Sequence, residues 1–248
     1  MYSQDIRIGT SGWSYPHWKG VFYPLDIPAD QWLAYYGAKL QSVEINSSFY
    51  RLPTQNALRH WRDTVRDDFV FSVKASRYIT HMKKLKAPEK VSQPLLDAIS
   101  TLEHKLGPVL FQLPPHWHFD EKRLEAFLPA LDTGFRYVFE FRDPSWFNSR
   151  CYAILRNYTT AFCIYDLGGR LSPKIVTTDF VYIRLHGPGA PYQGNYPDST
   201  LIEWADTISR WSDAGLSVYC YFNNDQFGYA VNNAMCLQQL LGLVKQGD

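Results

Sequence analysis

The sequence predicts a (β/α)8 barrel, or TIM barrel, formed as a single domain over residues 1–248. Three observations lead to this prediction. The chain has 248 residues, and a barrel of this kind takes about 250 residues as one domain. Short apolar runs alternate with amphipathic segments along the chain, which is typical of parallel βα units. Polar or charged residues also follow most of the apolar runs, as expected where functional groups gather at the carboxyl ends of barrel strands.

Eight apolar runs predict the strands of the barrel. They cover residues 6–9, 42–45, 69–74, 109–113, 137–141, 160–165, 180–185 and 216–222. Each has the length and the content of β-branched and aromatic residues expected of a buried strand. The connection after the sixth run is short, and the sequence predicts no regular element in it.

Amphipathic segments between these runs predict the helices. They cover residues 30–40, 54–65, 120–131, 145–158, 199–212 and 228–245, and one more helix ends near Leu106. Asp30, Thr54 and Asp120 stand where helix N-caps are expected. Gly215 follows the segment 199–212 and predicts its end.

The alternation within the strand runs predicts which side chains face the barrel interior. Ser42, Glu44 and Asn46 share one face of the second run, because successive side chains of a strand point to opposite sides. The other face carries Val43 and Ile45 and must meet the helices. The polar face is therefore expected to look into the barrel, near its C-terminal mouth, where buried polar groups satisfy one another or a ligand.

The expected mouth combines cations, carboxylates, amides and aromatic rings. We expect Arg142, Arg184 and Lys74 to hold an anion, because guanidinium and ammonium groups bind carboxylate or phosphate. Glu44 or Glu140 is the expected acid or base, and Lys74 could instead act as a Schiff-base lysine. The remaining candidates are His186 for proton transfer or ligand orientation, Gln112, Asn46 and Asn223 for polar contacts, and Trp13 and Tyr192 as rim aromatics.

Three alternatives remain open for these residues. The charges could form a self-satisfied salt-bridge network that closes the barrel end. Glu44 and Glu140 could form a glycosidase pair. No cofactor is predicted, but a divalent metal is an alternative, with Glu140, Asp166 and His186 as its ligands. Rim histidines could contribute to that metal site: His17, His81, His116 and His118.

Composition and charge place few limits on the partner. The net charge is +1, so any attraction to nucleic acid must come from a local patch. The segment 77–90 is predicted to be a basic loop that leads into the next helix. Its lysines could contact phosphates, although a solvated helical face is the more expected interpretation of these charges. The partner is expected to be an anionic small molecule or a nucleic-acid phosphate, and no obligate protein partner is evident.

The compartment is predicted from the cysteines and from the N-terminus. None of the four cysteines forms a Cys-x-x-Cys pair, and we expect all of them to be reduced. The first residues lack a signal-peptide pattern, and no stretch is apolar enough to span a bilayer. We therefore expect a cytoplasmic protein without a membrane partner.

Ordered blocks along nearly the whole chain resemble the YecE-like family, a domain of unknown function. The blocks begin with residues 8–15 and 43–50 and continue with 71–75, 110–115, 140–146, 182–187 and 221–225. The resemblance implies a TIM barrel and does not imply a reaction. The function expected from the residues is an enzyme, either a hydrolase or a lyase or isomerase, acting on a phosphate-bearing ligand. A metal-dependent phosphodiesterase acting on nucleic acid and a non-catalytic nucleic-acid or metabolite binder are the alternatives.

Overall fold

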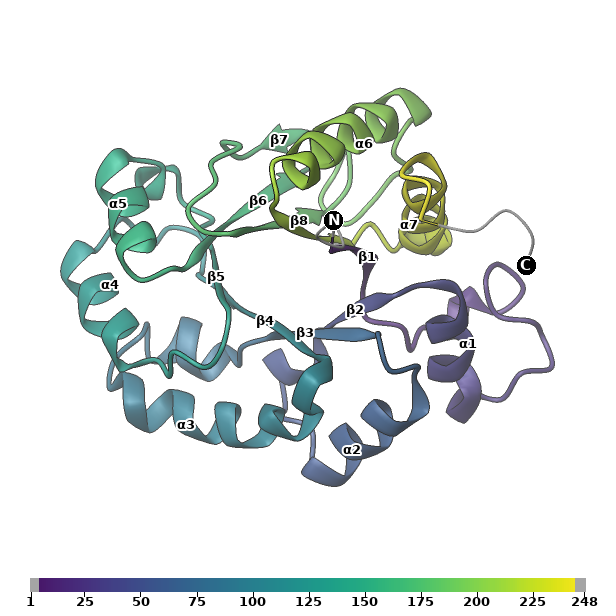
Figure 1. The fold of residues 1–248 in the computed structure, drawn as a ribbon, viewed down its shortest axis with the longest axis horizontal. Coiled ribbons are helices and arrows are strands. Elements are labelled where there is room, and N and C mark those ends of the chain that lie inside the picture. Colours follow the sequence, from purple (N-terminus) through teal and green to yellow (C-terminus); the bar gives the residue numbers. More distant parts are fainter. Residues whose placement is uncertain (1–4, 244–248) are drawn as a thin grey trace. The chain divides into compact units, whose positions relative to one another are not determined.

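The computed structural model describes residues 5–243, and its strands follow the order of a (β/α)8 barrel (Figure 1). The sheet order is β5-β4-β3-β2-β1-β9-β8-β6-β7, with a further pairing of β5 with β6. The strands are β1 Ile6–Ser11, β2 Ser42–Ile45, β3 Val70–Lys74, β4 Leu106–Gln112, β5 Tyr137–Glu140, β6 Ala161–Leu167, β7 Arg170–Leu171, β8 Phe180–Leu185 and β9 Ser217–Phe222. The fold is thus the predicted (β/α)8 barrel.

Helices follow most of the strands. The α-helices are α1 Trp32–Lys39, α2 Gln55–Thr64, α3 Pro88–Ile99, α4 Glu121–Phe127, α5 Ser149–Asn157, α6 Asp198–Asp213 and α7 Tyr229–Leu240. Short helical turns extend them, such as the turn Ser100–Lys105 that follows α3. Within residues 5–243, no helix is both long and apolar enough to cross a membrane.

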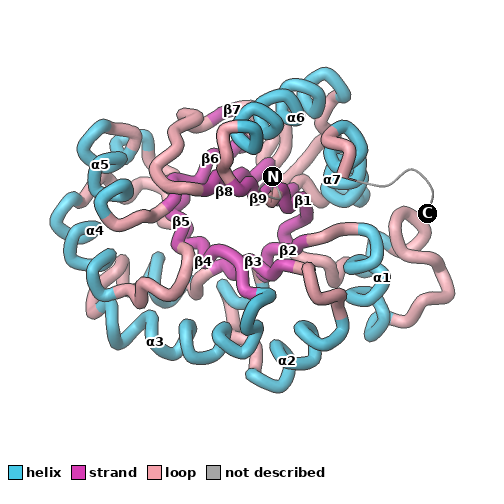
Figure 2. Tube along the Cα trace, in the orientation of Figure 1, coloured by secondary structure: helices cyan, strands magenta, loops and turns pink. Residues whose placement is uncertain are grey.

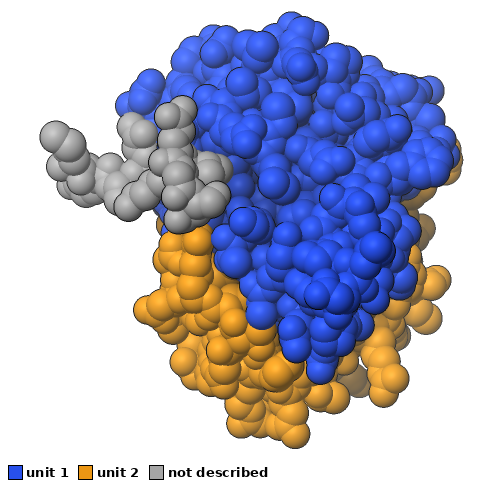
Figure 3. Space-filling model, turned by 90° about the vertical axis from the view of Figure 1, so that its right-hand side faces the viewer, with its two compact units in different colours: residues 1–43, 164–172, 179–248 blue, residues 44–163, 173–178 orange. Residues whose placement is uncertain are grey.

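The described chain separates into two compact units (Figure 3). Unit 1 comprises residues 1–43, 164–172 and 179–248, and unit 2 comprises residues 44–163 and 173–178. Unit 1 holds β1, β8 and β9 with α1, α6 and α7. Unit 2 holds β3, β4 and β5 with α2 to α5, and the boundaries fall within β2 and β6. The single domain expected from the sequence stays a prediction.

The predicted strands agree with the structure most closely where both ends are marked in the sequence. The second and seventh runs coincide with β2 and β8. The fourth differs most, because β4 begins at Leu106, where the sequence predicted the end of a helix. The two-residue strand β7, which pairs antiparallel with the end of β6, was not predicted. It is too short to give a pattern in the sequence.

Helix starts agree where a capping side chain stands in the sequence. The Thr54 side chain accepts a hydrogen bond from the Ala57 backbone N–H, and the Asp120 side chain accepts one from the Arg123 N–H. Asp30 was wrong as an N-cap, because it lies inside a 3-10 turn that precedes α1. The helix expected from residue 145 begins at Ser149, after the cap Asn148. The predicted end of the last helix at residue 245 lies outside the described residues.

Each unit has a core of large aromatic side chains. In unit 2, Phe141 stacks on Trp146 with 4.5 Å between ring centroids, and Phe111 stacks on Phe139 at 5.2 Å. In unit 1, Tyr23 stacks on Trp32 at 5.0 Å. Such rings bury large apolar areas. Figure 2 shows helices α2, α3 and α4 outside β3 and β4, so the helix-facing sides of these strands are covered.

Gly9 fixes a close approach between two strands of unit 1. A Cβ atom at this position would lie 1.9 Å from the Ser42 carbonyl oxygen. No larger residue fits without moving the backbone of β1 or β2. Gly9 therefore sets the position of β1, whose C-terminal end leads into the loop that carries Trp13.

Candidate functional site

The ends of β8 and β9 in unit 1 bring His186 and Asn223 together. The strands pair in parallel with Arg184 opposite Tyr221 and Leu185 opposite Phe222. The Asn223 backbone N–H then donates to the Leu185 carbonyl at 2.8 Å. The Asn223 Nδ2 lies 3.1 Å from His186 Nδ1. Because an amide nitrogen is a donor, Nδ1 accepts, and the proton of the neutral imidazole is on Nε2.

Arg184 and His186 are two residues apart and are both fully buried. Arg184 lies in the C-terminal part of β8, and His186 follows the strand after Leu185. A buried guanidinium keeps its charge, so its surroundings must supply acceptors. The sequence predicted both residues in the candidate site.

Asp166, at the end of β6, belongs to the same unit and contacts the loop after β8. The Tyr196 hydroxyl donates to Asp166 Oδ2 at 3.1 Å and accepts from the Gly187 backbone N–H at 2.9 Å. The second oxygen, Oδ1, is buried and has no hydrogen-bond partner within residues 5–243. Burial raises the pKa of Asp166, and the Tyr196 hydrogen bond offsets part of that rise.

Aromatic rings flank the His186 imidazole. The ring of Tyr192 lies 5.4 Å from it and the ring of Tyr165 lies 6.4 Å away, measured between centroids. Tyr192 has a positive φ of 65° and its backbone N–H donates to the His186 carbonyl. The candidate Tyr192 therefore lies beside His186, on a loop that folds back over the end of β8.

Trp13 lies in the loop that follows β1. Its carbonyl oxygen accepts a hydrogen bond of 2.6 Å from the Tyr23 hydroxyl. Because β1 pairs in parallel with β9, with Thr10 opposite Phe222, Trp13 follows its strand on the same side as Asn223. The loop is held further by Asp225, which accepts from the Trp18 indole at 2.6 Å.

An asparagine network that the sequence analysis missed supports the loop after β8. Asn224 donates to the Gly194 carbonyl and to Asn233 Oδ1, each at 2.8 Å. Asn233 donates in turn to Asn195 Oδ1 at 2.8 Å. Asn233 is buried on α7, far along the chain from the loop. No local pattern marks it, because an asparagine on a helix is usually exposed.

Glu140 and Arg142 form an ion pair in unit 2. The Arg142 Nε donates to Glu140 Oε1, and both side chains are almost completely buried. The Cys163 thiol lies 3.8 Å from the other oxygen, Oε2. The pair agrees with the expectation that one charge balances the other, while the proposed roles of Arg142 in anion binding and of Glu140 as acid or base stay predictions.

Lys74 lies at the end of β3 against an aromatic ring. Its Nζ is 4.2 Å from the centroid of Phe49. Ser48 joins the ends of β2 and β3, since its hydroxyl is 2.9 Å from the Ile45 carbonyl and 2.6 Å from the Lys74 carbonyl. Lys74 and Arg77 contribute to a lowered pKa of His81, after the larger effect of burial. Lys74 therefore belongs to a cationic and aromatic neighbourhood.

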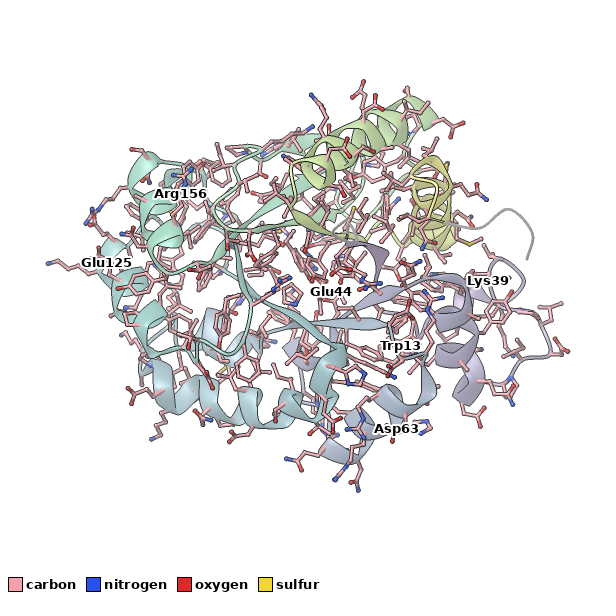
Figure 4. All side chains as sticks on the ribbon, in the orientation of Figure 1. Trp13, Lys39, Glu44, Asp63, Glu125 and Arg156 are labelled. Carbon is pink, nitrogen blue, oxygen red and sulfur yellow. The ribbon has the colours of Figure 1, made fainter. Side chains whose placement is uncertain are left out.

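The remaining candidates of unit 2 lie at or near strand ends. Gln112 ends β4 and stands opposite Glu140 in the register of β4 with β5. The Asn46 Oδ1 is buried and has no hydrogen-bond partner in the described part of the chain. Glu44 on β2 is fully buried. In Figure 4 it lies among the strands, whereas Glu125 projects outward from α4.

The three residues named for a metal site are divided between the two units: Glu140 lies in unit 2, and Asp166 and His186 lie in unit 1. Residues 5–243 contain no group of three or more His, Cys, Asp or Glu side chains that could hold a metal ion. The metal alternative stays a prediction. His118 is instead paired with Asp143 at 3.3 Å, and His17 with Asp225 at 3.0 Å.

The model of the family described as "Protein of unknown function DUF72" matches residues 7–247. The chain belongs to the DUF72 family. Among curated relatives, it is 32% identical to the UPF0759 protein YecE of Escherichia coli K12 over 145 residues, which are 57% of this chain and 50% of YecE. It is 24% identical to YunF of Bacillus subtilis, with 98% of this chain and 96% of YunF covered.

Solved structures of DUF72 family proteins have the same fold. The protein TM1631 of Thermotoga maritima superposes with a TM-score of 0.86 and 30% identity, covering 96% of this chain and 99% of that one. The protein EF0366 of Enterococcus faecalis superposes with a TM-score of 0.82 and 20% identity, covering 98% and 100%. The chain thus spans these two structures in full and about half of YecE. The predicted YecE-like family is confirmed.

Proposed function

We propose that this DUF72 protein is an enzyme that acts on a phosphate-bearing small molecule, bound at the ends of β8 and β9 in unit 1. The observation that carries the proposal is the buried His186, which Asn223 fixes through Nδ1 at 3.1 Å. The loops after the seventh and eighth strands of a barrel are the usual place for a phosphate site. In this chain β8 and β9 are the seventh and eighth parallel strands.

The loop after β8 supports an anion site through its backbone. It begins with Gly187, which has a φ of 115°. Tyr196 accepts from the Gly187 N–H, and Asn224, which follows β9, holds the loop from the other side together with Asn233 of α7. A loop that is fixed in this way presents its remaining polar groups in one arrangement, so little conformational entropy is lost when a ligand binds.

The side chains supply both charge and proton transfer. Arg184 is permanently cationic and matches the geometry of phosphate oxygens. The contact with Asn223 orients the His186 imidazole, a group that can transfer a proton to or from a ligand oxygen. Asp166 has a raised pKa and can take up or release a proton nearer to neutral pH than an exposed carboxylate.

Introduction of a negative charge at Asn223 tests the proposal. We expect millimolar inorganic phosphate or a phosphorylated sugar to raise the melting temperature of the wild-type protein. Asn223→Asp should abolish this shift, because a carboxylate at the same position repels the anion. Asn232→Asp on the exposed side of α7 is the matched control and should keep the shift. If no phosphate-bearing compound in a broad panel stabilises the wild type, or if both variants behave alike, the proposal is wrong.

A further inference from the structure

Three neighbouring loops of unit 2 form a surface that is both basic and aromatic. They follow β2, β3 and β4 and cover residues 46–54, 75–87 and 113–120. The first two contain no acidic residue, and the third contains only Asp120, which caps α4. Figure 1 shows the three strands side by side. We call these loops the basic–aromatic surface; its binding role does not rest on the phosphate site proposed above.

Contacts between cations and rings join the three loops. Lys74 Nζ lies 4.2 Å from the Phe49 ring, and the Phe49 ring lies 5.1 Å from that of His81. Lys84 Nζ lies 5.8 Å from the Trp117 ring. The first contact ties the loop after β2 to the end of β3, and the second ties it to the loop after β3. The third ties the loop after β3 to the loop after β4, so the loops present one continuous surface.

Two tyrosines on this surface are exposed to solvent. Tyr50 has 75% of its surface accessible and Tyr78 has 44%. Lys83 Nζ lies 5.4 Å from the Tyr78 ring centroid. An exposed ring with a cation beside it offers a face for stacking and a charge for a phosphate at the same place.

The backbone of the loop after β3 turns sharply, as expected of the basic loop that the sequence predicted over residues 77–90. Residues Tyr78–Met82 form a single π-helical turn. Lys84, Leu85 and Ala87 then have φ values of 46°, 61° and 50°. Leu85 is buried and anchors the turn, whereas the lysines on either side of it are exposed. Left-handed residues in succession cost conformational energy and are found mainly at functional sites. A π turn is also frequent there.

We infer that the basic–aromatic surface binds single-stranded nucleic acid. Lysine and arginine side chains attract the phosphate backbone, and exposed rings stack on bases of any sequence. A duplex keeps its bases stacked on one another, so the exposed tyrosines favour unpaired strands. A membrane surface is the less fitting partner, because Leu85 is buried and Met82 is the one large non-aromatic hydrophobic side chain that the loop after β3 exposes.

The test is fluorescence anisotropy of a labelled single-stranded oligonucleotide of mixed sequence, about 20 nucleotides long, in the presence of the full-length protein. We expect saturable binding that weakens as salt increases. Tyr78→Ala should weaken binding about tenfold, because the ring no longer stacks on a base. The double variant Lys83→Gln/Lys84→Gln should weaken it and reduce the slope of log K against log salt by about 0.7 for each phosphate that the lysines no longer neutralise.

Matched controls separate binding from folding. Tyr158→Ala removes a tyrosine of similar exposure at the end of α5, and Lys122→Gln removes an exposed charge on α4. Both controls should bind like the wild type, and all variants should keep the wild-type circular dichroism spectrum. The inference is overturned if the wild type does not bind the strand at low salt, or if the controls lose as much affinity as Tyr78→Ala. Equal or tighter binding to the matching duplex or to phosphatidylserine vesicles also overturns it.

Discussion

At the scale of single residues, the candidate site of unit 1 depends on hydrogen bonds that fix the orientation of side chains. His186 is oriented by Asn223, and Asp166 is oriented by Tyr196. Neither partner is adjacent in the chain. The sequence identified His186 and Asn223 separately, because each follows an apolar run, and the pairing arises from the register of β8 with β9. Orientation of this kind is what proton transfer requires.

Gly187 is expected to be essential for the loop after β8. A Cβ atom there would lie 2.3 Å from the Gln193 carbonyl and 2.7 Å from the Ala190 carbonyl. The Gly187→Ala variant should therefore lose about 1–3 kcal/mol of unfolding free energy, measured by urea denaturation. Gly189→Ala is the control, since nothing lies within 4 Å of its Cβ position. An equal effect of the two substitutions would contradict the argument.

Asp166 is expected to make stability depend on pH. Its folded-state pKa is raised, so the proton is held to higher pH in the folded chain than in the unfolded chain. The contribution of protonated Asp166 to the unfolding free energy is complete below the pKa of the unfolded state. It is lost as the pH rises through the pKa of the folded state. The melting temperature of Asp166→Asn, relative to wild type, should therefore rise as the pH increases above the unfolded-state value of about 4. Asp26→Asn, at an exposed position, is the comparison variant. A difference for Asp166→Asn that falls with increasing pH would refute the prediction.

At the scale of elements, capping residues decide how well helix starts can be predicted. Thr54 and Asp120 cap helices where the sequence places them, because each accepts a hydrogen bond from the backbone three residues later. Asp30 has the right residue type and does not cap, because the chain there makes a 3-10 turn first. A side chain of the right type can accept a hydrogen bond from the first turn of a helix. The local path of the backbone determines whether that hydrogen bond forms.

Removal of the Thr54 cap should destabilise α2. Thr54→Ala leaves the Ala57 N–H without its side-chain acceptor and should cost about 1 kcal/mol. Thr64→Ala at the end of the same helix is the control. The Thr64 hydroxyl bonds back to the His60 carbonyl, so its removal should change the unfolding free energy little. Chemical denaturation of both variants measures the difference. A destabilisation at Thr64 as large as that at Thr54 would argue against a capping role.

At the scale of the whole molecule, a net charge of +1 conceals an uneven distribution. The loops after β2, β3 and β4 concentrate positive charge, while most of the balancing carboxylates lie elsewhere in the chain. The sequence predicted a basic loop over residues 77–90 and did not show how its lysines meet the neighbouring loops. The positive φ values of Lys84, Leu85 and Ala87 turn that segment into a compact loop. Ring contacts then join it to Phe49 and Trp117.

The sequence by itself determined the fold class, and for strands such as β2 it predicted the face that carries polar groups. Both follow from local periodicity: apolar runs of strand length alternate with helical segments, and polar side chains recur every second residue. The sequence could not determine which of these polar groups meet. Only the tertiary structure decided three such pairs: Glu140 with Arg142, His186 with Asn223, and Asp166 with Tyr196. Strand register and loop path set these pairs, and both depend on packing between residues far apart in the chain.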